Sequence, residues 1–91
     1  MNVKIAGIEF DRVDYDRDAD VLYLHSGEPS SAVDWDESEE GHALRYSSDG
    51  TIVGITIVNA RRILAEDGEV AITLPTQRIV AKDLAPVLAA A

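Results

Sequence analysis

The stretch that decides the fold is Asp14-Tyr15-Asp16-Arg17-Asp18-Ala19-Asp20-Val21-Leu22-Tyr23-Leu24, in which aspartates on alternate positions lead into an apolar run. Aspartate favours turns because its side chain accepts hydrogen bonds from backbone amides two residues further on. We therefore predict a turn over residues 16–19 that joins a strand over 12–15 to a strand over 20–24. Both faces of Val21–Leu24 are apolar, which predicts that this strand is covered on both sides.

A second hairpin is predicted from residue 42 to residue 58. The strand-like runs 42–47 and 51–58 flank Ser48-Asp49-Gly50, and an Asp-Gly pair supplies the positive φ that tight hairpin turns need. Alternation along the second strand predicts that Val53, Ile55 and Ile57 face the core.

Two helices are predicted late in the chain. Asn59 is the expected N-cap of a short helix over residues 60–66, because an asparagine side chain can accept a free first-turn amide. A C-terminal helix is expected over residues 82–90, with Pro86 in its first turn. Strands in hairpin order with late helices indicate an α+β fold. We expect one domain over residues 1–91, with a single antiparallel sheet.

Composition limits the functions that are open to the chain. With 46% hydrophobic and 5% aromatic residues, a domain of this size has a modest core, so a homodimer is expected. The absence of cysteine excludes disulfides and cysteine-ligated metals. Neither a signal-like N-terminus nor a run of about 18 apolar residues is present. We therefore expect a cytoplasmic protein with no membrane contact.

The negative charge is concentrated in the first half of the chain. Residues 1–50 contain thirteen acids and four bases, which accounts for the whole net charge of −9. An acidic surface of this kind repels phosphate backbones, so nucleic-acid binding is disfavoured. A basic protein partner fits better. Its expected contact residues surround the single tryptophan: Asp34, Trp35, Asp36, Glu37, Glu39 and Glu40. The alternative is a solvated loop with Trp35 in the core.

The alternating aspartates also allow a metal-site hypothesis. A calcium loop that starts at Asp14 would use Asp14, Asp16 and Asp18, but it needs glycine at its sixth position and glutamate at its twelfth. Those positions hold Ala19 and His25. No metal or cofactor is therefore predicted. A metal or small-molecule site formed by the 14–20 turn with His25 or His42 stays as the second hypothesis.

A small hydrolase is the third hypothesis. The chain has no nucleophile-elbow pattern and no phosphate-binding glycine loop before a helix. A Ser–His–acid triad can assemble from distant positions, but the loops are short for a shielded cleft. We therefore expect that the protein is not an enzyme.

Two blocks of the sequence resemble the DUF2283 family, small bacterial and archaeal proteins of unknown function. The resemblance covers about residues 12–64 and rests on Tyr15, Asp16, Asp20, Leu22, Tyr23, Asp49, Gly50 and Gly54. We call these eight the motif residues. Thr56 stands where the family commonly has glutamate, and Arg61 where serine is frequent. The resemblance implies a compact β-rich domain and no established activity.

The motif residues have structural explanations as well. Asp16 and Asp20 can cap and close the first turn, and Tyr15 and Tyr23 are expected to pair across the hairpin. The leading hypothesis is therefore a non-enzymatic, self-associating protein-interaction or regulatory module.

Overall fold

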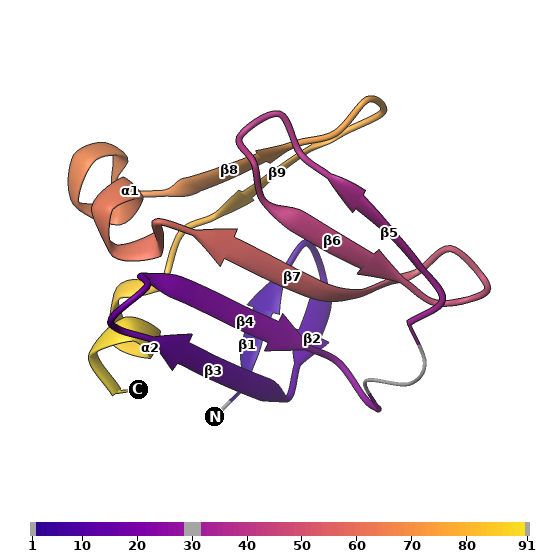
Figure 1. Ribbon diagram of the computed structural model, residues 1–91, viewed down its shortest axis with the longest axis horizontal. Coiled ribbons are helices and arrows are strands. Elements are labelled where there is room, and N and C mark those ends of the chain that lie inside the picture. Colours follow the sequence, from indigo (N-terminus) through magenta and orange to yellow (C-terminus); the bar gives the residue numbers. More distant parts are fainter. Residues whose placement is uncertain (1, 29–31, 91) are drawn as a thin grey trace.

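The computed structural model describes residues 2–28 and 32–90 of the chain (Figure 1). Short strands and two short helices follow one another along the sequence. Their bounds are β1 (Val3–Ile5), β2 (Ile8–Phe10), β3 (Arg12–Asp16), β4 (Val21–His25), β5 (Asp34–Glu37), β6 (Ala43–Tyr46), β7 (Ile52–Val58), α1 (Ala60–Asp67), β8 (Val70–Thr73), β9 (Arg78–Ala81) and α2 (Ala85–Ala90).

The central feature is a five-stranded antiparallel sheet in the order β3-β4-β7-β6-β5. The hairpins β1–β2 and β8–β9 form two further sheets of their own. The α+β class is confirmed, whereas the expectation of a single sheet is wrong. Strand β7 already has a neighbour on each edge, so the chain that leaves it through α1 finds no free edge there and pairs β8 with β9.

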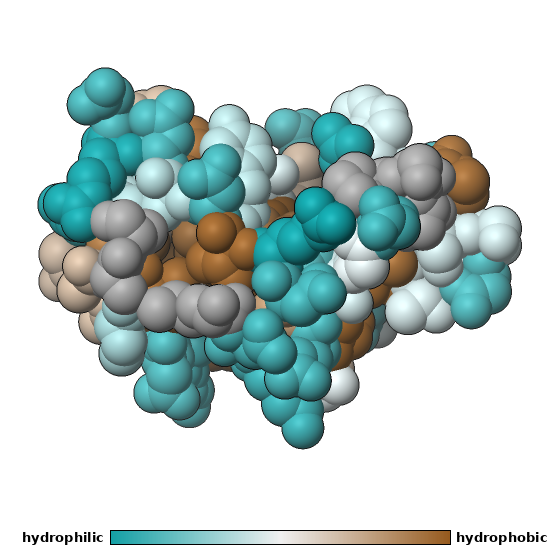
Figure 2. Space-filling model, turned by 90° about the horizontal axis from the view of Figure 1, so that it is seen from below, coloured by the Kyte–Doolittle hydropathy of each residue, from teal (hydrophilic) through white to brown (hydrophobic). Residues whose placement is uncertain are grey.

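The hydrophobic core lies on one face of the five-stranded sheet. The β1–β2 hairpin passes behind this sheet in Figure 1, and β2 contacts β7. Phe10, Leu22, Leu44 and Ile57 are fully buried in one cluster with residues of β8 and α2. Seen from below, the surface shows hydrophobic side chains near its middle and hydrophilic ones projecting at its margins (Figure 2). In residues 2–28 and 32–90, the elements outside the five-stranded sheet contribute to the hydrophobic cluster on its inner face.

The second hairpin forms as predicted, with one change of register. Gly50 has φ +84°, and Oδ1 of Asp49 accepts the Thr51 amide at 3.0 Å. The pairing of β6 with β7 shifts between Arg45 and Tyr46, because Tyr46 pairs with Ile52 while Arg45 pairs with Gly54. Such a bulge reverses the alternation beyond it. Ile52 is therefore buried and Val53 only half-buried, so the core prediction is right for Ile55 and Ile57 but wrong for Val53.

Strand β4 is covered on one face only, which corrects the prediction from its apolar run. Leu22 and Leu24 are buried, whereas Tyr23 points to the opposite face and is exposed. The register of β3 with β4 also differs from the prediction, because Tyr15 pairs with Leu22 and Tyr23 pairs with Asp14. The expected pairing of Tyr15 with Tyr23 is wrong, because the two side chains leave the sheet on opposite faces.

The two helices lie where they were expected, with different ends. Helix α1 runs to Asp67, one residue beyond the prediction, and stops at Gly68 with φ +76°, the left-handed C-terminal position that glycine favours. Helix α2 begins at Ala85 rather than at residue 82 and keeps Pro86 in its first turn, where a missing amide costs nothing. In the described part of the chain, no helix is long and apolar enough to cross a membrane.

Candidate functional site

The aspartates of the first turn hold the backbone instead of facing outward together. Oδ1 of Asp16 accepts the amides of Asp18 and Ala19 at 3.1 and 3.2 Å, as predicted for an aspartate that caps a turn. Asp20 has φ +57°, a left-handed conformation that aspartate tolerates better than most residues. This conformation directs its carboxylate toward the start of α1.

Asp20 caps helix α1 from a distant part of the sequence. Its Oδ1 accepts the Arg61 amide at 2.8 Å, its Oδ2 accepts the Arg62 amide at 3.2 Å, and its carbonyl oxygen accepts the Ala60 amide at 3.1 Å. Asn59 adopts a left-handed conformation and makes no side-chain cap, so the prediction that Asn59 caps this helix is wrong. The free first-turn amides of α1 are satisfied by the hairpin.

Tyr15 completes this junction. Its hydroxyl donates to Oδ1 of Asp20 at 2.7 Å, and the Arg61 guanidinium lies 5.7 Å from the centre of its ring. The hydrogen bond to Asp20 raises the pKa of Tyr15 above its usual value. Burial alone would raise the pKa of Asp20, but the donors from Arg61, Tyr15 and Arg62 outweigh it and lower that pKa. Asp20 is therefore a charged structural residue.

The proposed metal ligands are not brought together. Asp16 and Asp20 are occupied by backbone amides, and His42 is 1% exposed in the core, where its Nδ1 accepts the Val58 amide at 3.1 Å. Within residues 2–28 and 32–90, no three His, Cys, Asp or Glu side chains are grouped so that they could hold a metal ion. The 14–20 turn with either histidine does not form such a site there.

No nucleophile–base pair forms around the histidines in the described residues. Nδ1 of His25 donates to the Gly27 carbonyl oxygen at 3.3 Å, and the Nε2 atoms of His25 and His42 are buried without a hydrogen-bond partner. Burial lowers the pKa of His42, although the nearby Glu40 raises it in part. His42 is therefore a neutral core residue, not a general base next to a hydroxyl.

The acidic run over residues 34–40 divides into two parts: Glu40, which bonds to Thr73 of the same chain, and the exposed edge strand β5. In the first part, which we call the Glu40 latch, Glu40 accepts hydrogen bonds from the amide of Thr73 at 2.7 Å and from its hydroxyl. Burial would raise the pKa of Glu40, but these bonds lower it to about 2. Trp35 lies on the edge strand β5 and is 68% exposed. The alternative that Trp35 packs in the core is therefore wrong.

The face of the five-stranded sheet opposite the core, which we call the outer face, carries two rows of paired residues. Each row crosses all five strands because the pairing is in register. The basic row consists of Arg12, His25, Gly54, Arg45 and Trp35. The acidic row, two residues further along each strand, consists of Asp14, Tyr23, Thr56, Ala43 and Glu37.

A hollow of about 480 Å³ lies between these rows, over β3, β4 and β7. A Cβ atom on Gly54 would lie 3.3 Å from Cδ2 of His25 and 3.3 Å from Cβ of Arg45. Gly54, a motif residue, is thus needed for the close approach of its two neighbours and not for a positive φ. The missing side chain contributes to the depth of the hollow.

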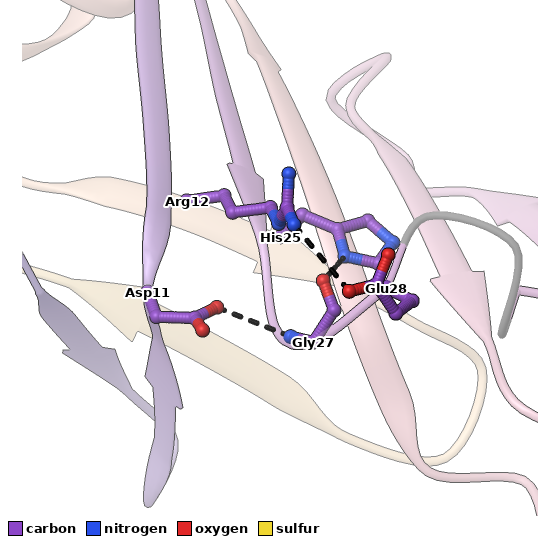
Figure 3. Close-up of polar contacts among 5 residues, drawn as sticks. All are labelled: Asp11, Arg12, His25, Gly27 and Glu28. Carbon is purple, nitrogen blue, oxygen red and sulfur yellow. Dashed lines mark hydrogen bonds and ion pairs between the residues drawn. The ribbon is translucent and has the colours of Figure 1, made fainter.

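The rim of the hollow at the end of β4 is fixed by short-range contacts (Figure 3). Oδ1 of Asp11 accepts the Gly27 amide at 3.1 Å, and the guanidinium of Arg12 lies 3.6 Å from Oε1 of Glu28. His25 is held between β3 and β7 by its bond to Gly27. Asp11 and Asp14 balance Arg12 and Arg45 around the hollow, so the hollow has no strong preference for a charged ligand.

The exposed large hydrophobic side chains gather on the outer face. In the described residues there are four of them: Val33 (66%), Trp35 (68%), Tyr23 (46%) and Val58 (36%). Trp35, Tyr23 and Val58 project from this face by strand alternation. Val33, just before β5, lines the same surface depression as Trp35 and Arg45. Tyr23 is a motif residue without a place in the core. Sequence reasoning missed Arg12, Arg45, Val33 and Val58, because only the strand order shows that they share a face.

The fold and the motif define a small α+β domain in which a hairpin caps a helix. The model of the family described as "Protein of unknown function (DUF2283)" matches residues 12–61, which is more than half of the chain. The chain belongs to this family. The matched segment begins with β3 and ends at Arg61, whose amide Asp20 binds. Neither the curated proteins nor the solved structures contain a match to this chain.

Proposed function

We propose that the protein is a non-enzymatic protein-interaction module and that the outer face of its five-stranded sheet is the interface. The observation that carries this proposal is the position of the four exposed large hydrophobic residues of the described chain. Trp35, Tyr23 and Val58 project from the outer face, and Val33 lies beside Trp35 at its edge. Exposed large apolar side chains that share one face with polar neighbours are typical of protein–protein contacts. Aromatic and arginine side chains, which are both present here, are enriched at such interfaces.

The hollow fits a protein side chain better than a small molecule. Small-molecule sites are concave enough to bury most of their ligand, whereas this hollow lies on an open sheet surface beside exposed Tyr23 and Arg45. The proposal also shifts the partner-binding region from the acidic run as a whole to its outward part. Trp35 and Glu37 lie on the outer face, whereas Glu40 is bonded to Thr73.

Photo-crosslinking in the producing cell tests this proposal. p-Benzoylphenylalanine is placed at position 23 or 35 on the outer face, and at position 66 on α1 as an exposed control. We expect a discrete protein adduct from positions 23 and 35, no adduct from position 66, and a loss of adduct when Val58→Asp adds a charge to the same face. Equal adducts at all three positions, or none at any of them, would contradict the proposal.

A further inference from the structure

The outer face is self-complementary in charge. We propose that its occupant is a second copy of this chain, packed face to face about a two-fold axis that crosses the strands between the basic row and the acidic row. This inference rests on the proposed interface and names its partner. The basic row carries Arg12 and Arg45, and the acidic row carries Asp14 and Glu37. A rotation about that axis places each row over the opposite row of the second copy.

This axis pairs opposite charges twice. Positions across the sheet are kept and positions along the strands are reversed, so Arg12 lies over Asp14 of the second copy. Tyr23 then lies over His25 of the second copy, and the gap at Gly54 faces Thr56 of the second copy. A self-complementary patch of this kind is what a two-fold interface requires.

Among the axes that keep the strands of the two copies aligned, the alternative is disfavoured by charge. An axis parallel to the strands along β7 would place β3 over β5 of the second copy. Asp14 would then face Glu37 of the second copy, and this contact would occur twice. Like charges held together at an interface are costly and act against such an arrangement. The positions of Arg12, Asp14 and Glu37 thus favour the axis that crosses the strands.

The size and net charge of the outer face suit a weak dimer. Five strands about 4.8 Å apart and five residues at about 3.3 Å each give roughly 24 by 17 Å, or about 400 Å² in projection. Because side chains protrude from this plane, the accessible surface area that the two copies bury together is larger, toward the low end of the range for specific interfaces. The strand residues on this face include two bases, Arg12 and Arg45, and three acids, Asp14, Asp16 and Glu37. The net charge of the face is therefore −1, compared with −9 for the whole chain.

A charge-swap cycle followed by sedimentation equilibrium tests the inference. The variants are Arg12→Glu, Asp14→Arg and the double variant, with Arg78→Glu on β9 as a control of matched charge. We expect a reversible wild-type dimer and a dissociation constant raised about tenfold by each single outer-face change, since every contact occurs twice. The double variant restores the constant to within about threefold, and Arg78→Glu leaves it near the wild-type value.

Asp14→Arg is the most discriminating of these variants. It lowers the net negative charge of the chain, so general repulsion between copies would predict tighter association, whereas the proposed contact predicts weaker association. Circular dichroism and thermal melting confirm that each variant is folded. This is expected because Arg12 and Asp14 are exposed and the Arg12–Glu28 ion pair, which Arg12→Glu removes, lies at the surface.

The results separate this inference from the proposed function. A monomeric wild type, or a double variant that dimerises no better than the single variants, overturns the second copy as the occupant. If a monomeric wild type still gives adducts with another protein from positions 23 and 35, the proposed interface stands and only this inference fails. If the crosslinked adduct has the mass of two chains and the swap restores association, both are supported.

Discussion

Tyr15 and Asp20 meet across the first hairpin, and the Tyr15 hydroxyl donates to Oδ1 of Asp20 at 2.7 Å. The same oxygen accepts the amide of Arg61 at 2.8 Å. One carboxylate therefore links a turn to a helix that starts 40 residues later in the sequence, as the positions of Asp20 and Ala60 show. The motif residues Tyr15 and Asp20 therefore have a structural role, although a tyrosine hydroxyl and a carboxylate at this distance could also form part of a binding site.

Replacing Asp20 tests the strength of this junction. Asp20→Ala removes the cap, which costs about 1–2 kcal/mol, and places alanine at a positive φ, which adds about 1 kcal/mol. Asp20→Asn keeps an acceptor and tolerates the backbone, so we expect a loss below about 1 kcal/mol. Urea unfolding measures both, with Asp18→Ala as the control in the same turn. Equal stability of the two Asp20 variants would contradict the capping role.

The sequence was sufficient for local features and insufficient for those that depend on strand order. Asp49-Gly50 and Asp16 act in their own turns, so short-range chemistry predicts both hairpins. The cap on α1 comes from Asp20 instead of the adjacent Asn59, because tertiary contact overrode a local preference. The bulge that moves Val53 out of the core depends on how β6 and β7 pair.

The candidate site was harder to predict for the same reason. The basic row draws its residues from positions 12 to 54 of the sequence. They form a row only once β7 lies between β4 and β6. The apolar run of β4 did not indicate which of its faces is exposed, and Tyr23 points away from the buried Leu22. Whether its face is covered depends on where the second layer packs.

Gly54→Ala tests the close approach beneath the hollow. The new methyl group would lie 3.3 Å from both His25 and Arg45, so one of them must move, and overpacking of this kind costs about 1–3 kcal/mol. We expect His25→Ala to recover a substantial part of that loss in the double variant. Chemical denaturation of the four proteins in the cycle gives the coupling energy. Additive changes in the free energy of unfolding would show that contact with the His25 ring is not the cause of the lost stability.

The Glu40 latch predicts a pH-dependent contribution to stability. Its pKa is lowered from 4.5 to about 2 in the folded protein, so its stabilising effect is complete above the unfolded value and is lost as the pH falls through the folded value. Because Glu40 is exposed, we expect less than about 1 kcal/mol. Glu40→Gln should melt below wild type near neutral pH and converge with it toward about pH 2. Glu39→Gln serves as the control, and a constant difference at all pH values would contradict the latch.

His42 predicts a loss of stability at a higher pH than Glu40 does. Its pKa is lowered in the folded protein by burial, so the unfolded chain binds a proton below about pH 6.5 while the folded chain does not. Stability therefore decreases as the pH falls below about 6.5, by up to about 1.4 kcal/mol per pH unit. His42→Phe leaves the Val58 amide without its acceptor and should cost about 1–3 kcal/mol at high pH. Its stability should then stay nearly level over the range in which wild type declines. Urea titrations at a series of pH values measure the difference between the two curves, and parallel curves would show that His42 does not titrate with folding.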